Sequence, residues 1–152
     1  MQEFVSYYAS KVGVLRIAAN HETLTSVVFV NHSNDNDVLP SDLTHECQKQ
    51  LEAYFSKKLK KFDLPLANSN TLYQHAVRQQ MVDTYYGTTT TYQAIAKNIN
   101  PEHPGPRAVG NVCNKNPFHI IVPCHRVLAS NGKLTGYAAG IEKKQWLLAH
   151  EQ

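Results

Sequence analysis

The first thirty residues alternate between apolar and polar positions with a period of two, which is typical of strands with one buried face. Three segments rich in β-branched and aromatic residues follow one another, at residues 5–9, 12–19 and 24–30. Turn-like breaks at residues 11–13 and 20–22 separate them. The pattern predicts a small antiparallel sheet.

A polar loop over residues 31–40 leads into the first segment with helical periodicity. Ser41 or Asp42 can cap this helix. Its apolar positions recur at helical spacing: Leu43, Cys47, Leu51, Tyr54 and Phe55. Cys47 lies on this stripe, so we expect it in the core without a chemical role. Residues 65–70 are predicted to form a linker.

Beyond the linker the helical period dominates. The first amphipathic helix has its apolar face at Tyr73, Ala76, Val77 and Met81. Thr91 can cap a second helix, with apolar positions at Tyr92, Ile95, Ala96 and Ile99. Residues 100–105 break it, and Pro106 suits the first position of a third helix. The predicted buried face of that helix is Ala108, Val109, Val112 and Cys113.

These elements predict an α+β protein with two domains. Residues 1–66 are expected to form a small N-terminal domain, an antiparallel sheet with one helix. Residues 67–152 are expected to form a mainly helical domain. The second and third of the predicted C-terminal helices, separated by a short break, have the proportions of a helix-turn-helix.

The composition restricts the cellular compartments in which we expect this protein. The chain has no apolar run near the roughly 20 residues that a membrane span needs, and its first residues do not resemble a secretion signal. Its three cysteines are an odd number without metal-ligand spacing, which favours a reducing compartment and no disulfide framework. We therefore expect an intracellular protein, in the cytoplasm or in a eukaryotic nucleus, with no metal and no membrane partner.

The net charge of +3 is compatible with nucleic acid but does not require it. Lys57, Lys58, Lys60 and Lys61 form one basic cluster, which we assign to a helix end, where cations offset the helix dipole. On the third C-terminal helix, four residues share one face: Arg107, Gly110, Asn111 and Asn114. Such a face suits close approach to a phosphate backbone, although its periodicity fits a solvated surface equally well.

Cys124 is the candidate nucleophile. It follows the apolar run 120–123 and directly precedes His125 and Arg126. Only the thiolate attacks, so a reactive cysteine needs a neighbouring base or cation. Adjacent residues on an extended chain point in opposite directions, so we expect His125 to act through a water. Cys113, on the buried helix face, is expected to be a core residue.

The run Pro123-Cys124-His125-Arg126 resembles the active-site signature of the O6-alkylguanine–DNA alkyltransferase family. Further matches occur in the family's order: Arg107-Ala108-Val109-Gly110, Asn116-Pro117, Gly136-Tyr137 and Trp146-Leu147-Leu148-Ala149-His150-Glu151. The resemblance covers residues 72–152 and implies a winged-helix-like domain. The first half resembles the family only in length and strand-rich pattern.

The resemblance implies repair by direct reversal. An alkyl group would pass irreversibly from O6 of guanine, or O4 of thymine, in double-stranded DNA to Cys124. The damaged base must first flip out of the stack. No cofactor is implied, and we expect a monomer that acts once per molecule.

The resemblance also assigns residues to roles. His125 would take the thiol proton and Glu151 would orient it, as in a catalytic triad, although fraying near the chain end could loosen Glu151. Tyr92 would donate to the guanine, and Asn116 would brace the turn before the active-site segment. The substrate-binding residues implied are Val127, Tyr137, Ala138 and Ala139. Arg107 would fill the gap left by the flipped nucleotide, and the other DNA contacts implied are Ala108, Gly110, Asn111 and Asn114.

Three segments depart from the family pattern. Ala138-Ala139-Gly140 replaces the usual Ser-Gly-Gly or Ala-Gly-Gly, and the methyl group of Ala139 is expected to narrow tolerance for bulky alkyl groups. Arg78 stands where tryptophan is common, and residues 83–87 replace an Ile-Pro-Tyr-Gly turn. We expect these last two to affect packing only.

Three alternative functions compete. An alkyltransferase-like damage sensor binds alkylguanine without reaction, but such relatives lack the cysteine present here as Cys124. A Cys-His hydrolase or protease would need a local signature that is absent. A helix-turn-helix regulator would explain Arg107 but not the cysteine.

Overall fold

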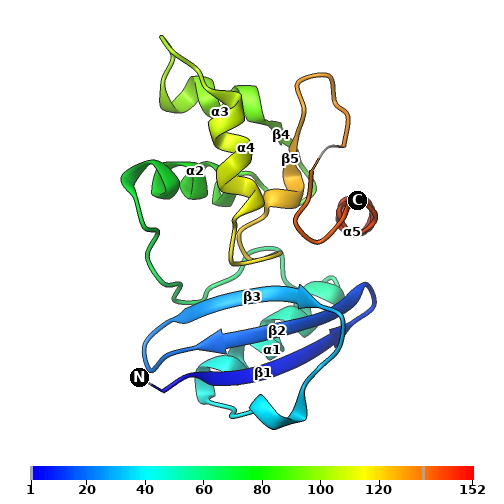
Figure 1. Ribbon diagram of the computed structural model, residues 1–152. Helices are drawn as coiled ribbons and strands as arrows, with labels where there is room; N and C mark the ends of the chain where they lie inside the picture. The colour runs from blue at the N-terminus through cyan, green and yellow to red at the C-terminus, as the bar shows by residue number, and fades with distance from the viewer. Residues whose placement is uncertain (1, 135) are drawn as a thin grey trace. The chain divides into compact units, whose positions relative to one another are not determined.

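The computed structural model in Figure 1 describes residues 2–134 and 136–152. The chain forms two compact units. The N-terminal unit comprises the chain up to Ala67 together with Pro117–Ile121, and the C-terminal unit comprises Asn68–Asn116 and Val122–Gln152. The chain therefore passes from the C-terminal unit into the N-terminal unit at Pro117 and returns to the C-terminal unit after Ile121.

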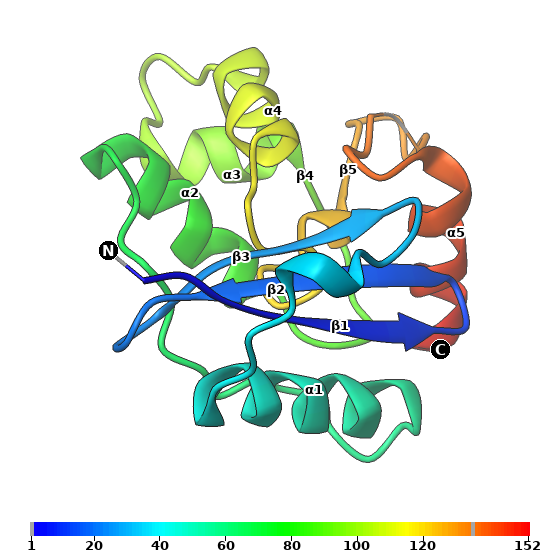
Figure 2. The ribbon, with the colours of Figure 1, turned by 60° about the horizontal axis from the view of Figure 1, so that its bottom comes forward.

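The N-terminal unit is an antiparallel sheet with a helix packed against it. Strands β1 (Phe4–Ser10), β2 (Gly13–Ala19) and β3 (Leu24–Val30) pair in sequence order. Helix α1 (Asp42–Phe55) lies along one face of the sheet (Figure 2). The predicted sheet and helix are confirmed, and the polar loop between them also contains a short 3-10 turn.

Local signals define the ends of α1. The Ser41 hydroxyl accepts from the Thr44 backbone N–H, and the Thr44 hydroxyl accepts from the Ser41 backbone N–H, which forms a reciprocal capping box. The buried face holds Cys47, Leu51 and Tyr54, as the sequence predicts. Burial raises the pKa of the Cys47 thiol to about 12, so this thiol stays protonated in the core.

The four lysines follow the end of α1 and do not belong to its last turn. Lys57 has a left-handed backbone with φ of 64°, and its N–H donates to the Tyr54 carbonyl at 3.1 Å. The Lys58 N–H donates to the Ala53 carbonyl at 2.8 Å. This paired arrangement is a Schellman motif, which reverses the chain and ends the helix before the lysines.

Two outlying segments pair with β3. The Leu24 N–H donates to Pro65, and the Ala67 N–H donates to Leu24, both at 2.8 Å. The first part of the predicted linker is therefore held by the sheet. Further along β3, the Phe29 N–H donates to the His119 ring at 3.2 Å, which brings in the segment Pro117–Ile121.

The C-terminal unit is mainly helical. Its elements are α2 (Leu72–Val82), β4 (Thr90–Thr91), α3 (Tyr92–Ile99), α4 (Pro106–Asn114), β5 (Val127–Leu128) and α5 (Ile141–His150). Strands β4 and β5 form a short parallel pair. The α+β fold class is confirmed. In the described residues, no helix is long and apolar enough to cross a membrane.

Helices α3 and α4 form the predicted helix-turn-helix (Figure 1). The Thr91 hydroxyl caps α3 by accepting from the Ala94 N–H at 3.0 Å, and Pro106 starts α4. The prediction that Ala108 is buried is wrong, because this residue is exposed. Each helical residue turns the chain by about 100°, which takes Ala108 well away from the stripe formed by Val109 and Cys113.

Candidate active site

Cys124 begins a short 3-10 helix, Cys124–Arg126, and is only 3% exposed. Pro123 before it has φ −81° and ψ 66°, and the Cys124 N–H donates to the Val122 carbonyl at 2.8 Å. These values describe an inverse γ-turn. The expectation of an extended chain at the nucleophile is therefore wrong, because the proline turns the backbone immediately before it.

Asn116 contacts both the backbone and the nucleophile. Its Nδ2 donates to the Val122 carbonyl at 2.9 Å and to Cys124 Sγ at 3.3 Å. Burial raises the pKa of the Cys124 thiol, while the Asn116 amide and the Lys144 ammonium lower it. The resting thiol is therefore neutral, and these donors favour the thiolate once a base removes its proton.

His125 is fully buried and its Nε2 lies 2.7 Å from Glu151 Oε2. Burial alone would raise the pKa of Glu151, but hydrogen bonds from His125 and Arg126 hold it well below its usual range. An ionised carboxylate only accepts hydrogen bonds, so Nε2 of His125 carries the hydrogen. Burial lowers the pKa of His125 against the opposing influence of Glu151, which keeps the ring neutral.

The second ring nitrogen of His125 is therefore an acceptor. Nδ1 has no hydrogen-bond partner among the described residues. A neutral imidazole with a fixed tautomer and an available Nδ1 lone pair is suited to accept a proton. Transfer of the thiol proton to Nδ1 through a water stays a prediction.

Glu151 is firmly held although the chain ends one residue later. Arg126 donates from Nε to Oε1 and from Nη2 to Oε2, both at 2.9 Å. The Gly87 N–H donates to Oε1 at 3.2 Å. Glu151 is 5% exposed, and these contacts hold its carboxylate in the interior. Residues 83–87 also do more than affect packing, because they reach this carboxylate.

Lys144 is a site residue that the sequence argument missed. Its side chain is buried, and its Nζ donates to the Val127 carbonyl at 2.7 Å and lies 5.8 Å from the centroid of the Tyr92 ring. A signal was present, because Lys144 lies seven residues, about two helical turns, before Glu151, which directly follows α5. Burial lowers the pKa of Lys144, and the thiol of Cys124 raises it.

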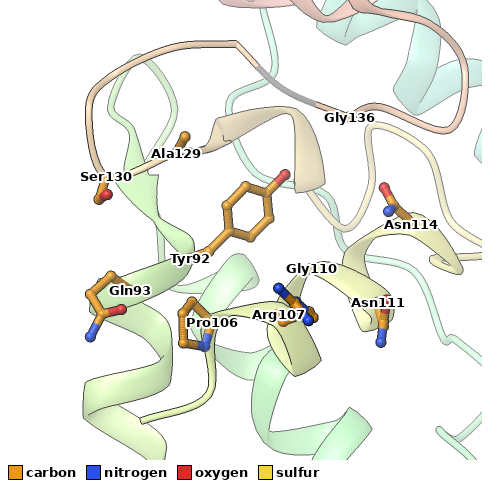
Figure 3. A pocket seen from close by; sticks show the side chains of 10 residues that line it. All are labelled: Tyr92, Gln93, Pro106, Arg107, Gly110, Asn111, Asn114, Ala129, Ser130 and Gly136. Carbon is orange, nitrogen blue, oxygen red and sulfur yellow. The ribbon is translucent and has the colours of Figure 1, made fainter.

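A pocket of about 450 Å³ opens beside α4 (Figure 3). The four residues predicted to share a polar face all line it, together with the predicted donor Tyr92. The lining residues are Tyr92, Gln93, Pro106, Arg107, Gly110, Asn111, Asn114, Ala129, Ser130 and Gly136. Figure 3 shows the Tyr92 ring lying between α4 and the segment that contains Ala129.

The structure places the other predicted residues outside this pocket lining. Val127 is fully buried in β5, and Tyr137 is 8% exposed, with its pKa raised by burial. Ala138 is exposed, Ala139 is half-buried and Ala108 is exposed on α4. The Val127 backbone carbonyl accepts a hydrogen bond from Lys144 Nζ.

The fold and the site together define a class: a helix-turn-helix protein with a buried cysteine and a His–Glu pair that can remove its proton. Comparison with known proteins identifies the family within this class. Residues 72–152 match the DNA binding domain of 6-O-methylguanine DNA methyltransferase, and residues 4–68 match the ribonuclease-like domain of the same family.

Relatives match along almost the whole chain. A methylated-DNA–protein-cysteine methyltransferase of Methanosarcina acetivorans is 44% identical, covering 95% of this chain and 97% of the relative. The protein of the same name from Haemophilus influenzae is 33% identical, covering 98% and 86%. The crystal structure of Mycobacterium tuberculosis O6-methylguanine methyltransferase is 34% identical, with a TM-score of 0.86 over 99% of this chain and 93% of that chain. The chain belongs to the 6-O-methylguanine DNA methyltransferase family.

Proposed function

We propose that this protein repairs alkylated DNA by direct reversal, with Cys124 as the acceptor of the alkyl group. The observation that carries the proposal is the arrangement around this thiol. A buried sulfur accepts a hydrogen bond from Asn116, and the neighbouring His125 is paired with an ionised Glu151. This site provides a nucleophile and a base.

The chemistry balances without a cofactor. The thiol proton passes through a water to Nδ1 of His125, and Glu151 stabilises the imidazolium that forms. The sulfur then attacks the alkyl carbon, a C–S bond forms, and the bond from that carbon to O6 breaks. The electron pair stays on the guanine, which takes a proton from the site as it leaves. Tyr92, in the pocket, is the donor that we assign to this step.

The stability of the product explains why each molecule acts only once. Cys124 becomes a thioether, and none of the described groups around it provides a step that would cleave a C–S bond. Each molecule therefore acts once and needs no regenerating cofactor. The same attack on O4 of alkylated thymine follows the same electron flow.

The DNA partner is assigned to the face of α4. Arg107, Asn111 and Asn114 are exposed there, and Gly110 offers no side chain that would keep a backbone away. We assign Arg107 to the gap left by the flipped nucleotide, since inserted side chains offset lost stacking. In this proposal, contacts to the DNA phosphates set the position of α4 on the duplex, because such contacts fix a protein's register and orientation.

Residues 67–152 carry both activities in this proposal, with residues 1–66 as a separate domain. We propose a monomer that acts where the genome lies, in the cytoplasm or in a eukaryotic nucleus. The damage-sensor alternative is less favoured, because the thiol that such proteins lack is present with its base.

Intact-protein mass spectrometry tests the function. The protein is mixed with duplex DNA that contains one O6-methylguanine, and Cys124→Ala is treated in the same way. A gain of one methylene group, absent in the variant, would establish transfer to this sulfur. Unchanged mass with tight damage-dependent binding would refute transfer in favour of the sensor.

A further inference from the structure

The turn at residues 83–87, between α2 and β4, reaches the charged pair behind the nucleophile at three points. The Thr84 carbonyl accepts from Arg126 Nη1 at 2.8 Å. The Tyr86 ring lies against the guanidinium of Arg126, with 5.8 Å between the ring centroid and the central carbon. The Gly87 N–H donates to Glu151 Oε1 at 3.2 Å. The turn therefore holds both members of the ion pair.

The Glu151 carboxylate is fully occupied by these contacts. Oε1 accepts from Arg126 Nε and Gly87, and Oε2 accepts from His125 and Arg126 Nη2. A carboxylate offers about four lone-pair positions. Rotation of the carboxylate would break several bonds at once, so its plane is fixed, and one of the four donors comes from the turn.

Glycine is the residue that occupies position 87 without strain. Its φ of +80° lies in the left-handed region, which side chains with a β-carbon rarely adopt. An added Cβ would also lie 3.0 Å from the backbone carbonyl oxygen of Glu151. The close approach that delivers the Gly87 N–H to the carboxylate therefore requires the absence of a side chain.

We propose that Gly87 is a positioning residue for alkyl transfer: with its turn it fixes the Glu151 carboxylate, and through it the His125 ring that removes the proton from Cys124. The inference rests on the proposed function, which it deepens. None of residues 83–87 lines the pocket beside α4, so the turn acts through the carboxylate and not through contact with the base.

Iodoacetamide provides a test that needs no alkylguanine. Its reaction with Cys124 is followed across pH by peptide mass in the parent protein and in Gly87→Ala. We expect a rate roughly 10- to 100-fold lower at neutral pH, because a displaced base contributes less to proton removal. The pH midpoint of the reaction should also rise by about one unit, a change that loss of stability alone would not produce.

Gly132→Ala is the matched control. Gly132 has φ of +79°, but an added Cβ there would meet nothing within 4 Å. This variant carries the same backbone penalty without the collision at Glu151. Its reaction rate should stay within about twofold of the parent. Affinity of Gly87→Ala for undamaged duplex DNA should also stay within about twofold, since α4 is untouched.

A second pair of variants covers the case in which Gly87→Ala does not fold. Tyr86→Leu removes the ring against Arg126 and should lower the rate roughly 3- to 10-fold, whereas Tyr86→Phe keeps the ring and should restore it. A folded Gly87→Ala that matches Gly132→Ala at every pH would overturn the proposal. If Gly87→Ala does not fold, equal rates for the two Tyr86 variants would overturn it. A parent protein that reacts with iodoacetamide but takes no methyl group from DNA would refute the proposed function instead.

Discussion

Glu151→Gln should damage both stability and transfer, for reasons visible in the hydrogen bonds of the carboxylate. The substitution keeps the shape of the side chain but removes its charge. In the parent protein, four donated hydrogen bonds converge on the two carboxylate oxygens of Glu151. An amide has one oxygen, and its NH₂ group would face donors from Arg126 or His125. Arg126, only 6% exposed, would lose its counter-charge.

The size of the effect follows from burial. Removing one partner of a buried ion pair typically costs about 3–5 kcal/mol, and we expect the free energy of unfolding to fall by this amount at pH 7. Transfer should slow by roughly 10²- to 10⁴-fold, because the His125 tautomer is no longer fixed. The stability loss should shrink in acid. The folded-state pKa of Glu151 is depressed, so its contribution is present above its unfolded pKa and is lost as the pH falls.

Urea unfolding at pH 7 measures the first quantity, and the single-turnover rate with O6-methylguanine DNA measures the second. Asp37→Asn is the control, because Asp37 also pairs with an arginine, with Nε of Arg16 at 3.2 Å, but its side chain is 33% exposed. Asp37 also accepts from the Tyr7 hydroxyl, but a pair that solvent reaches contributes less than a fully buried one. If Glu151→Gln costs no more than Asp37→Asn and transfers at the parent rate, the reasoning about the buried pair is refuted.

Three further predictions use other parts of the structure. Lys144→Met should slow iodoacetamide modification of Cys124 by roughly tenfold or more at neutral pH, because a buried cation that favours the thiolate is lost; Lys97→Met, an exposed change, is the control. Ala139→Gly should raise the transfer rate from benzylated guanine relative to methylated guanine. Acid should destabilise the protein through His119. Burial lowers its pKa from 6.5 to about 4, so its neutral form is favoured in the fold. Stability should fall by about 3 kcal/mol as the pH drops from 6.5 to 4, as measured by urea midpoints, and His119→Phe should flatten this dependence.

A contrary measurement would refute each of these predictions. Equal iodoacetamide rates for the two lysine variants would remove Lys144 from the thiol's environment. An unchanged ratio of benzyl to methyl transfer would show that the methyl group of Ala139 does not limit the substrate. The same acid sensitivity in His119→Phe as in the parent would assign that sensitivity to other groups.

Local sequence determined the secondary structure and pointed to Cys124 as the candidate nucleophile. The helix boundaries depend on nearby residues: Ser41 and Thr91 cap helices that begin at the next position, and Pro106 starts α4. Strands β1 to β3 follow from the alternation of apolar residues. Such signals operate over a few positions, so they survive in the linear chain. The family motif around Cys124 is also contiguous.

The tertiary structure alone decided what surrounds that thiol. Arg126 and Gly87 meet Glu151 from distant positions in the chain. Lys144 reaches Val127 across seventeen positions. Local periodicity does not predict these contacts, because a buried charge is stable only once its partners are in place. The sequence identified Cys124 as the candidate nucleophile and His125 as its neighbour. The packing of remote segments determines the charge, tautomer and orientation of the groups that would make it react.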